Sequence, residues 1–545
     1  MHSHGRTFAL SLLAAAAFLL AGGCSRGLAM QPRTVAPCSW SYFGDPRSVA
    51  HERHVFTACI GTDGRTVVED YDLDSGDRRL RTLFEPLEAD DHNNPSLVFF
   101  HERLYAFSSP HSGYLYPRDR RSRMRYRVSR QPWAGGGGWG PTRTVPLGAG
   151  CGLGYTYPNP VVAGGRLYLF MRGPCWAPYF TSTADGRHWT APRTLVQSPS
   201  RALQDGGGAR RVRPYAKYAG TSDGSILMTF SDGHPGSFKS SLYFARFKGG
   251  RLFRADGRSI GTVGDRPVRF DQLDRVEPYS RSGGRAWPMD VAEGRDGQPV
   301  VVYSSLVGTS DTFRYARWDG RRWSTRPIAR AGRTLFSYHN SGATLDHDDP
   351  SWVVLSRTID GQNEIEARRT PDHGRSWCPI QLTHGSRTFN IRPVVPRGLS
   401  DPRRLAVLYV SGSARSFREY DTDVVMATAE RPAPPRGGAG SAIQPTWACW
   451  SPGPSSRAVV SRRRSGAAAW ASSTARVSST SIATSPSRSS RLSARVRSRR
   501  APPPLSSTRT CCRCTGRASR TARPTSSCAT YPATTCARSC AAKGR

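Results

Sequence analysis

The sequence predicts an all-β fold, a seven-bladed β-propeller, between residues 38 and 430. Short runs rich in Val, Tyr, Phe and Leu recur between Gly, Asp, Asn and Pro turns, as in residues 96–107, 161–171 and 405–410. No segment shows helical periodicity of useful length. A hairpin motif built around an aspartate and a tryptophan also repeats along the chain. Together these features are typical of repeated β-sheets joined by tight turns.

The clearest copy of the motif is Thr-Pro-Asp-His-Gly-Arg-Ser-Trp at residues 370–377, which matches the Asp-box hairpin. Its aspartate is expected to cap the turn and its tryptophan to pack between sheets. Residues 182–189 are a degenerate copy, and residues 319–323 a weaker one. About 390 residues at roughly 50–55 per blade predict about seven blades. A pair of β-sandwiches is the alternative, but such domains usually have about 100 residues each.

The chain begins with a basic segment, an apolar run over residues 8–20 and then Ala-Gly-Gly-Cys. This pattern predicts a signal peptide over residues 1–24, and the run is too short to span a membrane. The segment before Cys24 resembles a bacterial lipobox, with Cys24 as the lipid anchor to the membrane; ordinary secretion is the alternative. Either case predicts a lipid-anchored or secreted protein of the bacterial cell envelope. Residues 25–37 are expected to be a linker.

Residues 431–545 differ in composition from the rest of the chain. They hold 21 of the Lys and Arg residues and no acid, which leaves +17 of the net charge of +38 for the remainder. Such a low-complexity Arg, Ser, Ala and Pro segment cannot bury enough apolar surface to fold, so we expect it to be disordered or translated out of frame. We expect no binding to nucleic acid. The remaining positive charge favours an anionic polysaccharide as partner.

Five cysteines lie between residues 25 and 430. In an exported protein they can form disulfides, and the local pairs Cys38–Cys59 and Cys151–Cys175 are the economical arrangement, although spacing alone does not fix the connectivity. No cysteine has zinc-site spacing. We expect no cofactor, and the sequence leaves open a structural metal ion.

Four side chains beside short apolar runs supply two imidazoles, a phenol and a guanidinium: His92, His111, Tyr157 and Arg172. This set can remove a proton from the carbon next to a carboxylate, because a cation neutralises the acid, a base takes the proton and an acid protonates the departing oxygen. We expect His92 and Tyr157 to be the acid/base pair, Arg172 to bind the carboxylate and His111 to assist. Further substrate contacts are expected from Asn94, Lys217, Tyr218 and His234.

Several motifs occur in an order that resembles the BNR-repeat propellers that include the ulvan lyases. They are residues 38–47 (CSWSYFGDPR), 90–95 (DDHNNP), His111, 156–161 (TYPNPV), 167–173 (LYLFMRG), 213–218 (RPYAKY), 231–235 (SDGHP), 287–292 (WPMDVA) and 337–342 (SYHNSG). The resemblance implies a seven-bladed propeller and a polysaccharide lyase that cleaves a uronate polymer by β-elimination. We expect such an enzyme to be a monomer.

Two other functions are consistent with the same motifs. One is a sialidase-type glycosidase, because Asp boxes occur in that group, although such chemistry needs an arginine triad and a Tyr/Glu pair that the sequence does not show. The other is a non-catalytic glycan-binding lipoprotein on the same scaffold. Fold alone cannot decide among them, because propellers support many functions.

Overall fold

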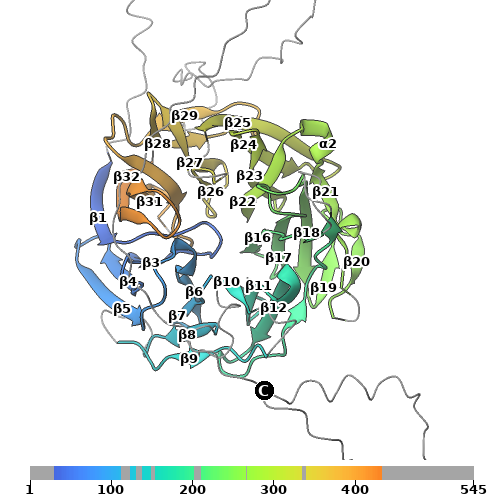
Figure 1. Cartoon of the computed structure of the whole chain (residues 1–545), viewed down its shortest axis with the longest axis horizontal. Helices are drawn as coiled ribbons and strands as arrows, with labels where there is room; N and C mark the ends of the chain where they lie inside the picture. Colours follow the sequence, from blue (N-terminus) through green and yellow to red (C-terminus); the bar gives the residue numbers. More distant parts are fainter. Residues whose placement is uncertain are drawn as a thin grey trace, which may run out of the picture. The chain divides into compact units, whose positions relative to one another are not determined.

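The computed structural model describes residues 30–111, 123–130, 138–148, 154–201, 210–264, 267–333, 335, 339–399 and 401–431. Their strands form seven sheets that follow one another in a ring around a common centre (Figure 1). The predicted seven-bladed propeller is therefore confirmed, and the two-sandwich alternative is wrong. The predicted signal peptide, including Cys24, lies outside the described residues, as do residues 432–545. No helix of the described residues is long and apolar enough to cross a membrane.

Six blades follow in chain order, each an antiparallel sheet whose first strand lies nearest the centre (Figure 1). The first three blades comprise β2 (Ser48–His51), β3 (His54–Ile60), β4 (Thr66–Asp72) and β5 (Arg78–Phe84); β6 (Ser96–Phe100), β7 (Arg103–Ser108), β8 (Arg125–Val128) and β9 (Arg143–Thr144); and β10 (Thr156–Ala163), β11 (Arg166–Arg172), β12 (Pro178–Thr183) and β13 (Arg193–Thr194). The fourth has two additional strands and comprises β16 (Ala216–Gly220), β17 (Ile226–Ser231), β18 (Leu242–Lys248), β19 (Arg251–Phe253), β20 (Ser259–Thr262) and β21 (Asp274–Glu277).

The fifth and sixth blades comprise β22 (Arg285–Glu293), β23 (Pro299–Val307), β24 (Ser310–Trp318) and β25 (Trp323–Arg333), then β26 (Ala343–Leu345), β27 (Trp352–Ile359), β28 (Gln362–Arg369) and β29 (Cys378–Gln381). A separate short ribbon is formed by β14 (Ser200–Arg201) and β15 (Arg210–Arg211). The described helical elements are single turns, namely η1 (Asp91–Asn93), η3 (Pro174–Trp176), η4 (Phe270–Gln272) and α2 (Tyr279–Ser282).

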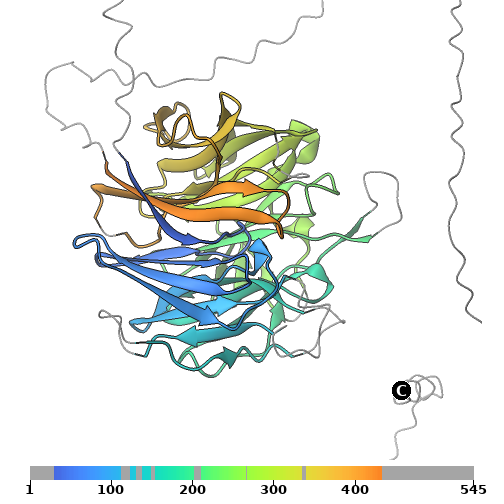
Figure 2. The same ribbon diagram turned by 60° about the vertical axis from the view of Figure 1, so that its left-hand side comes forward.

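The seventh blade joins the two ends of the folded chain. Its inner strands β30 (Phe389–Val394), β31 (Arg404–Ala414) and β32 (Tyr420–Glu430) come from the C-terminal side, and β1 (Gln31–Pro37) completes the sheet by pairing with β32. Figure 2 shows the orange strands of this blade beside the blue strands of the first. The strand expected over residues 405–410 is confirmed as part of β31. The linker expected over residues 25–37 is wrong from Gln31 onward, because residues 31–37 form β1, whose hydrogen bonds to β32 close the ring.

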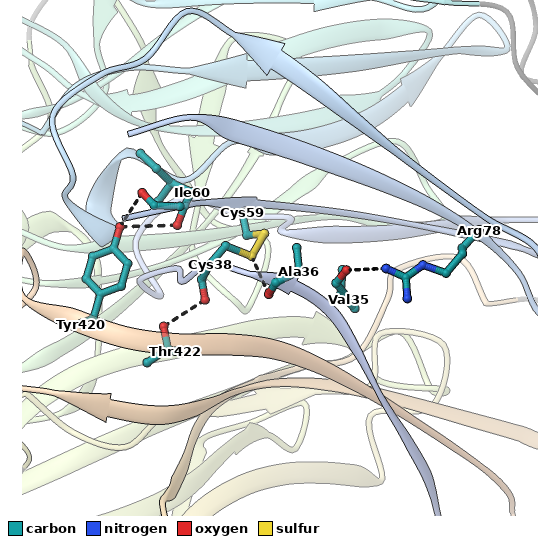
Figure 3. Close-up of a disulfide and its surroundings, with 9 residues drawn as sticks. Val35, Ala36, Cys38, Cys59, Ile60, Arg78, Tyr420 and Thr422 are labelled. Carbon is teal, nitrogen blue, oxygen red and sulfur yellow. Dashed lines mark hydrogen bonds between the residues drawn. A yellow bond between two sulfur atoms is a disulfide. The ribbon is translucent and has the colours of Figure 1, made fainter. Parts of the chain in front are cut away.

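A disulfide fixes this closure. Cys38, directly after β1, is bonded to Cys59 in β3 with a Cα–Cα distance of 5.9 Å, as the sequence predicted (Figure 3). Beside it, Thr422 Oγ1 donates to the Cys38 carbonyl at 3.0 Å, and the Tyr420 hydroxyl donates to the Gly61 carbonyl at 3.1 Å. The last blade and the first are thus held together covalently and by hydrogen bonds. The other predicted pair includes Cys151, which lies outside the described residues.

The three predicted hairpin motifs all connect the third and fourth strands of a blade. In the best copy, Asp372 accepts hydrogen bonds from the amide and hydroxyl of Ser376, both at 2.7 Å, and Trp377 is fully buried with its ring 5.3 Å from Tyr315. In the other two copies, Asp185 and Asp319 likewise accept backbone amides of their turns. The expected capping role of the aspartate and the expected packing of the tryptophan are confirmed.

Candidate active site

The four residues expected to carry the chemistry lie together at one face of the propeller. His92 is in η1, just before the inner strand β6, and Tyr157 is in the inner strand β10. His111 follows β7, and Arg172 ends β11, so both lie where a second strand finishes. Because neighbouring strands are antiparallel and all blades have the same orientation, inner strands begin and second strands end at the same face. Rigid strands thereby bring residues from two blades to one place.

The two imidazoles form a stacked pair bridged by one carboxylate. The rings of His92 and His111 are 4.3 Å apart and nearly parallel, at 9°. Asp90, which is fully buried, accepts from Nδ1 of His92 at 2.9 Å through one oxygen and from Nδ1 of His111 at 3.0 Å through the other. An ionised carboxylate only accepts, so it fixes the proton of each ring on Nδ1. Nε2 of a neutral ring is then left as an acceptor.

The environment separates the pKa values of the two histidines. Burial opposes a charge on His92, but the carboxylates of Asp91 and Asp90 outweigh it and raise the pKa. Burial lowers the pKa of His111 to about 4, and the positive charges of His92 and Arg172 act in the same direction. At neutral pH His111 is therefore a neutral imidazole with a lone pair on Nε2, whereas His92 favours the charged form.

Tyr157 and Arg172 form the other half of the site. The guanidinium carbon of Arg172 lies 4.3 Å from the centre of the Tyr157 ring. Tyr157 has a left-handed backbone, with φ of 61°, a strained conformation that is common at functional sites. Burial raises the pKa of its phenol well above the usual value, so the group is a proton donor, not a tyrosinate.

Arg172 is buried but incompletely bonded. Its side chain is 7% exposed, and its Nε and Nη1 atoms have no hydrogen-bond partner among the described residues. Burial alone would lower its pKa, but the phenols of Tyr157 and Tyr215 raise it, so the charge is retained. A buried cation with unused donors is costly unless a ligand supplies the acceptors.

An aromatic floor that the individual motifs did not identify supports these groups. Phe43 stacks with its centroid 4.9 Å from His92 and 4.9 Å from Tyr157, and lies 4.8 Å from Tyr215. Trp287 lies 5.9 Å from Phe43 and closes the floor from the fifth blade. Phe43 and Trp287 lie within the motifs at residues 38–47 and 287–292. The aromatic residues of those motifs were therefore the sequence feature that could have indicated this floor.

The tip of the β31–β32 hairpin also reaches the site from the far end of the chain. The Phe417 ring packs edge-on against His92 and His111, at 4.9 and 5.6 Å. The Phe417 carbonyl accepts the Asp91 amide at 2.9 Å, and Arg418 Nε lies 3.3 Å from Asp90. No sequence motif indicated this contact, because the residues are more than 300 positions from η1.

Three of the four residues expected to contact substrate are instead bonded within the fold. Asn94 Oδ1 accepts from the amide and the hydroxyl of Ser41. Lys217 is buried and ion-paired with Asp45. Tyr218 stacks on Phe170 at 4.3 Å, and burial raises its pKa.

His234 lies closer to the predicted chemistry. Its ring is 5.3 Å from Tyr215, and its Nδ1 accepts the Gly236 amide at 2.9 Å. Burial, followed by the charge of Arg213, holds its pKa well below the usual value, so it is neutral.

Asp90, His92 and His111 are also the group of described residues whose ligand atoms are close enough to hold a metal ion, all within 4.8 Å of one another. In the structure, Nδ1 of each imidazole is hydrogen-bonded to Asp90. The arrangement therefore combines a neutral imidazole, a protonated phenol and a buried guanidinium with two unused donor atoms around an aromatic floor.

Comparison with known proteins agrees with this class of fold. A family model described as "BNR repeat-containing family member" matches residues 54–331, and the chain belongs to this family. No curated protein sequence matches it.

Solved structures of similar fold include a polysaccharide lyase of family PL25, an ulvan lyase bound to -[GlcA(1-4)Rha3S]-, with a TM-score of 0.54 and 13% identity over 74% of this chain and 95% of that one. The polysaccharide lyase Uly1 has a TM-score of 0.52 and 11% identity over 74% of this chain and 99% of that one. At this identity the likeness concerns the fold.

Proposed function

We propose that this protein is a polysaccharide lyase that cleaves a uronic-acid-containing anionic polysaccharide by β-elimination. The observation that carries the proposal is the buried guanidinium of Arg172, with two donor atoms that have no partner among the described residues, near a protonated phenol, Tyr157, and a neutral imidazole, His111. The fold of the PL25 ulvan lyase is consistent with an ulvan-like substrate.

In the proposed reaction, the free donors of Arg172 bind the uronate carboxylate. This neutralises its charge and makes the adjacent C5 proton more acidic. Nε2 of His111 takes the proton, the C5–H electrons form the C4=C5 double bond, and the C4–O4 bond breaks. The Tyr157 hydroxyl protonates the departing oxygen. The step consumes no oxidant, reductant or water.

The roles differ from those expected from the sequence in one respect. His92 was expected to share the acid/base work with Tyr157, but it is bonded to two carboxylates that favour its charged form, so we assign the base to His111. Binding of a carboxylate to Arg172 offsets one of the charges that lower the pKa of His111, which makes it a stronger base when substrate is present.

The test is the ultraviolet absorbance of the unsaturated product after incubation with a panel of uronate polymers. A hydrolase forms no such chromophore, and a binding protein forms no product at all. Among the described residues, the charged groups with the largest effect on the pKa of Tyr157 are Arg172, Asp90 and Arg213, and none is a glutamate, which does not favour the sialidase-type alternative. Measurable binding without absorbance and without any shortened product would establish the glycan-binding alternative, whereas shortened products without absorbance would establish a hydrolase.

We further propose that the protein is exported and anchored through Cys24 as a monomer. Labelling with a radioactive fatty acid, compared between the wild type and Cys24→Ala, tests the anchor.

A further inference from the structure

A second arginine, Arg213, lies close to Arg172, the arginine proposed to bind the carboxylate. Both guanidinium groups lie over the ring of Trp176. The guanidinium carbons of Arg172 and Arg213 are 5.0 and 5.4 Å from the centre of the Trp176 ring. The three residues come from different elements: the end of β11, the segment before β16, and η3. Trp176 and Arg213 are both partly exposed, so a ligand can reach them, whereas Arg172 is buried.

No carboxylate of the described residues forms an ion pair with Arg172 or Arg213. The nearby histidine, His234, is neutral, and both arginines contribute to lowering its pKa. Two like charges are therefore held near one ring, and no acid of the described residues is paired with either. Their mutual repulsion is relieved if each receives an anionic group of a ligand.

The backbone holds the tryptophan in place at some cost. Cys175 and Trp176 both have left-handed backbones, with φ of 57° and 63°. At Gly173 a Cβ would lie 2.7 Å from the Tyr179 ring and 2.8 Å from the Tyr155 ring, so a larger residue there would displace one of these rings. Strain of this kind persists where the surrounding structure enforces it, typically at ligand-binding positions.

We infer that Arg213 and Trp176 form a second anion subsite, which binds a negatively charged group of the substrate other than the carboxylate bound by Arg172. The inference rests on the proposed function. Since both guanidinium groups lie against one indole ring, the two anionic groups belong to the same sugar or to adjacent sugars of the polymer. The indole supplies an apolar face for a sugar ring, and the Arg213 fork suits either a sulfate ester or a carboxylate.

The experiment compares binding and initial elimination rates for three polymers. The first carries uronate and a sulfate ester on the adjacent sugar, the second is the same polymer after chemical desulfation, and the third is a polyuronate with a carboxylate on every sugar. Arg213→Gln removes the charge while retaining a polar side chain, and Arg213→Lys retains the charge without the fork. Arg187→Gln is the matched control, because Arg187 is exposed in the turn after β12, at the end of that strand remote from Arg172.

We expect Arg213→Gln to weaken binding of a doubly anionic polymer by about tenfold to a hundredfold, the loss of one hydrogen bond to a charged group. Binding of the desulfated polymer should be unchanged, and Arg187→Gln should affect none. An effect confined to the sulfated polymer identifies a sulfate ester as the ligand, and an effect on the polyuronate identifies a carboxylate. Trp176→Ala should weaken binding of all three polymers, whereas Trp176→Phe should retain most of the binding.

Equal losses on all three polymers with Arg213→Gln, or no loss on any, would overturn the subsite. Calorimetric binding separates this failure from failure of the proposed function. If the wild type binds the polymers without eliminating them, the lyase proposal fails while the pattern of Arg213 variants still decides the subsite.

Discussion

Replacement of Arg172 by alanine tests the proposed chemistry most directly. The side chain presents two unsatisfied donors at a buried position, and a uronate carboxylate is the acceptor they fit. Loss of this charge-assisted contact should cost about 3 kcal/mol in the transition state, or roughly a hundredfold in kcat/KM. The fold should tolerate the change. The lost cation–π contact with Tyr157 is worth about 1–2 kcal/mol, and removal of an unpaired buried charge offsets it.

The same substitution should also change the pKa of His111, which can be measured independently of the elimination rate. The positive charge of Arg172 disfavours a proton on His111 and is one cause of its low pKa, which is about 4. In Arg172→Ala the pKa of His111 should therefore rise toward the usual value for histidine, whether or not substrate is present.

The assay combines elimination rates measured by absorbance with NMR titration of the histidine side chains and with thermal unfolding. Arg187→Ala is the control for loss of an arginine at a remote exposed position. The reasoning is refuted if Arg172→Ala retains wild-type elimination, or if the pKa of His111 does not move although the protein stays folded.

Three further predictions concern Tyr157, pH and the end of the propeller. Tyr157→Phe removes only the phenolic oxygen, so kcat should fall by about a hundredfold while substrate binding, measured by calorimetry, stays unchanged. Because a neutral His111 is required, kcat/KM should fall as pH decreases through the His111 pKa of about 4, not through 6.5; an acid limb near 6.5 would contradict the assignment of the base. Truncation after Arg431 should leave the melting temperature and activity unchanged, since the later residues lack core side chains. Truncation before Arg431 should lower the free energy of unfolding by about 3 kcal/mol, because Asp346, which is fully buried, loses its ion pair; equal melting temperatures for the two truncations would refute this.

The sequence alone determined the architecture, because strand periodicity and turn chemistry are local properties. The Asp-box turn at residues 370–377 requires an aspartate, a glycine and a tryptophan at fixed spacing, and the structure places these as expected. The local disulfide Cys38–Cys59 and the strand over residues 405–410 were also predicted from local sequence. The N-terminal boundary of the propeller was placed too late, at residue 38, because β1 contains two prolines and does not resemble a strand in sequence. This segment is a strand through its pairing with β32.

The environment of each catalytic candidate was decided only by the tertiary structure. From the sequence alone, nothing distinguished the expected pKa values of His92 and His111. Their pKa values diverge because the carboxylates of Asp91 and Asp90 outweigh burial at His92, whereas burial and the charge of His92 outweigh Asp90 at His111. Lys217 and Tyr218 have the residue types of a binding groove, yet one is bonded to Asp45 and the other is stacked in the core. A motif specifies which groups a chain can offer, but charge, exposure and partners arise when blades distant in sequence meet at one face.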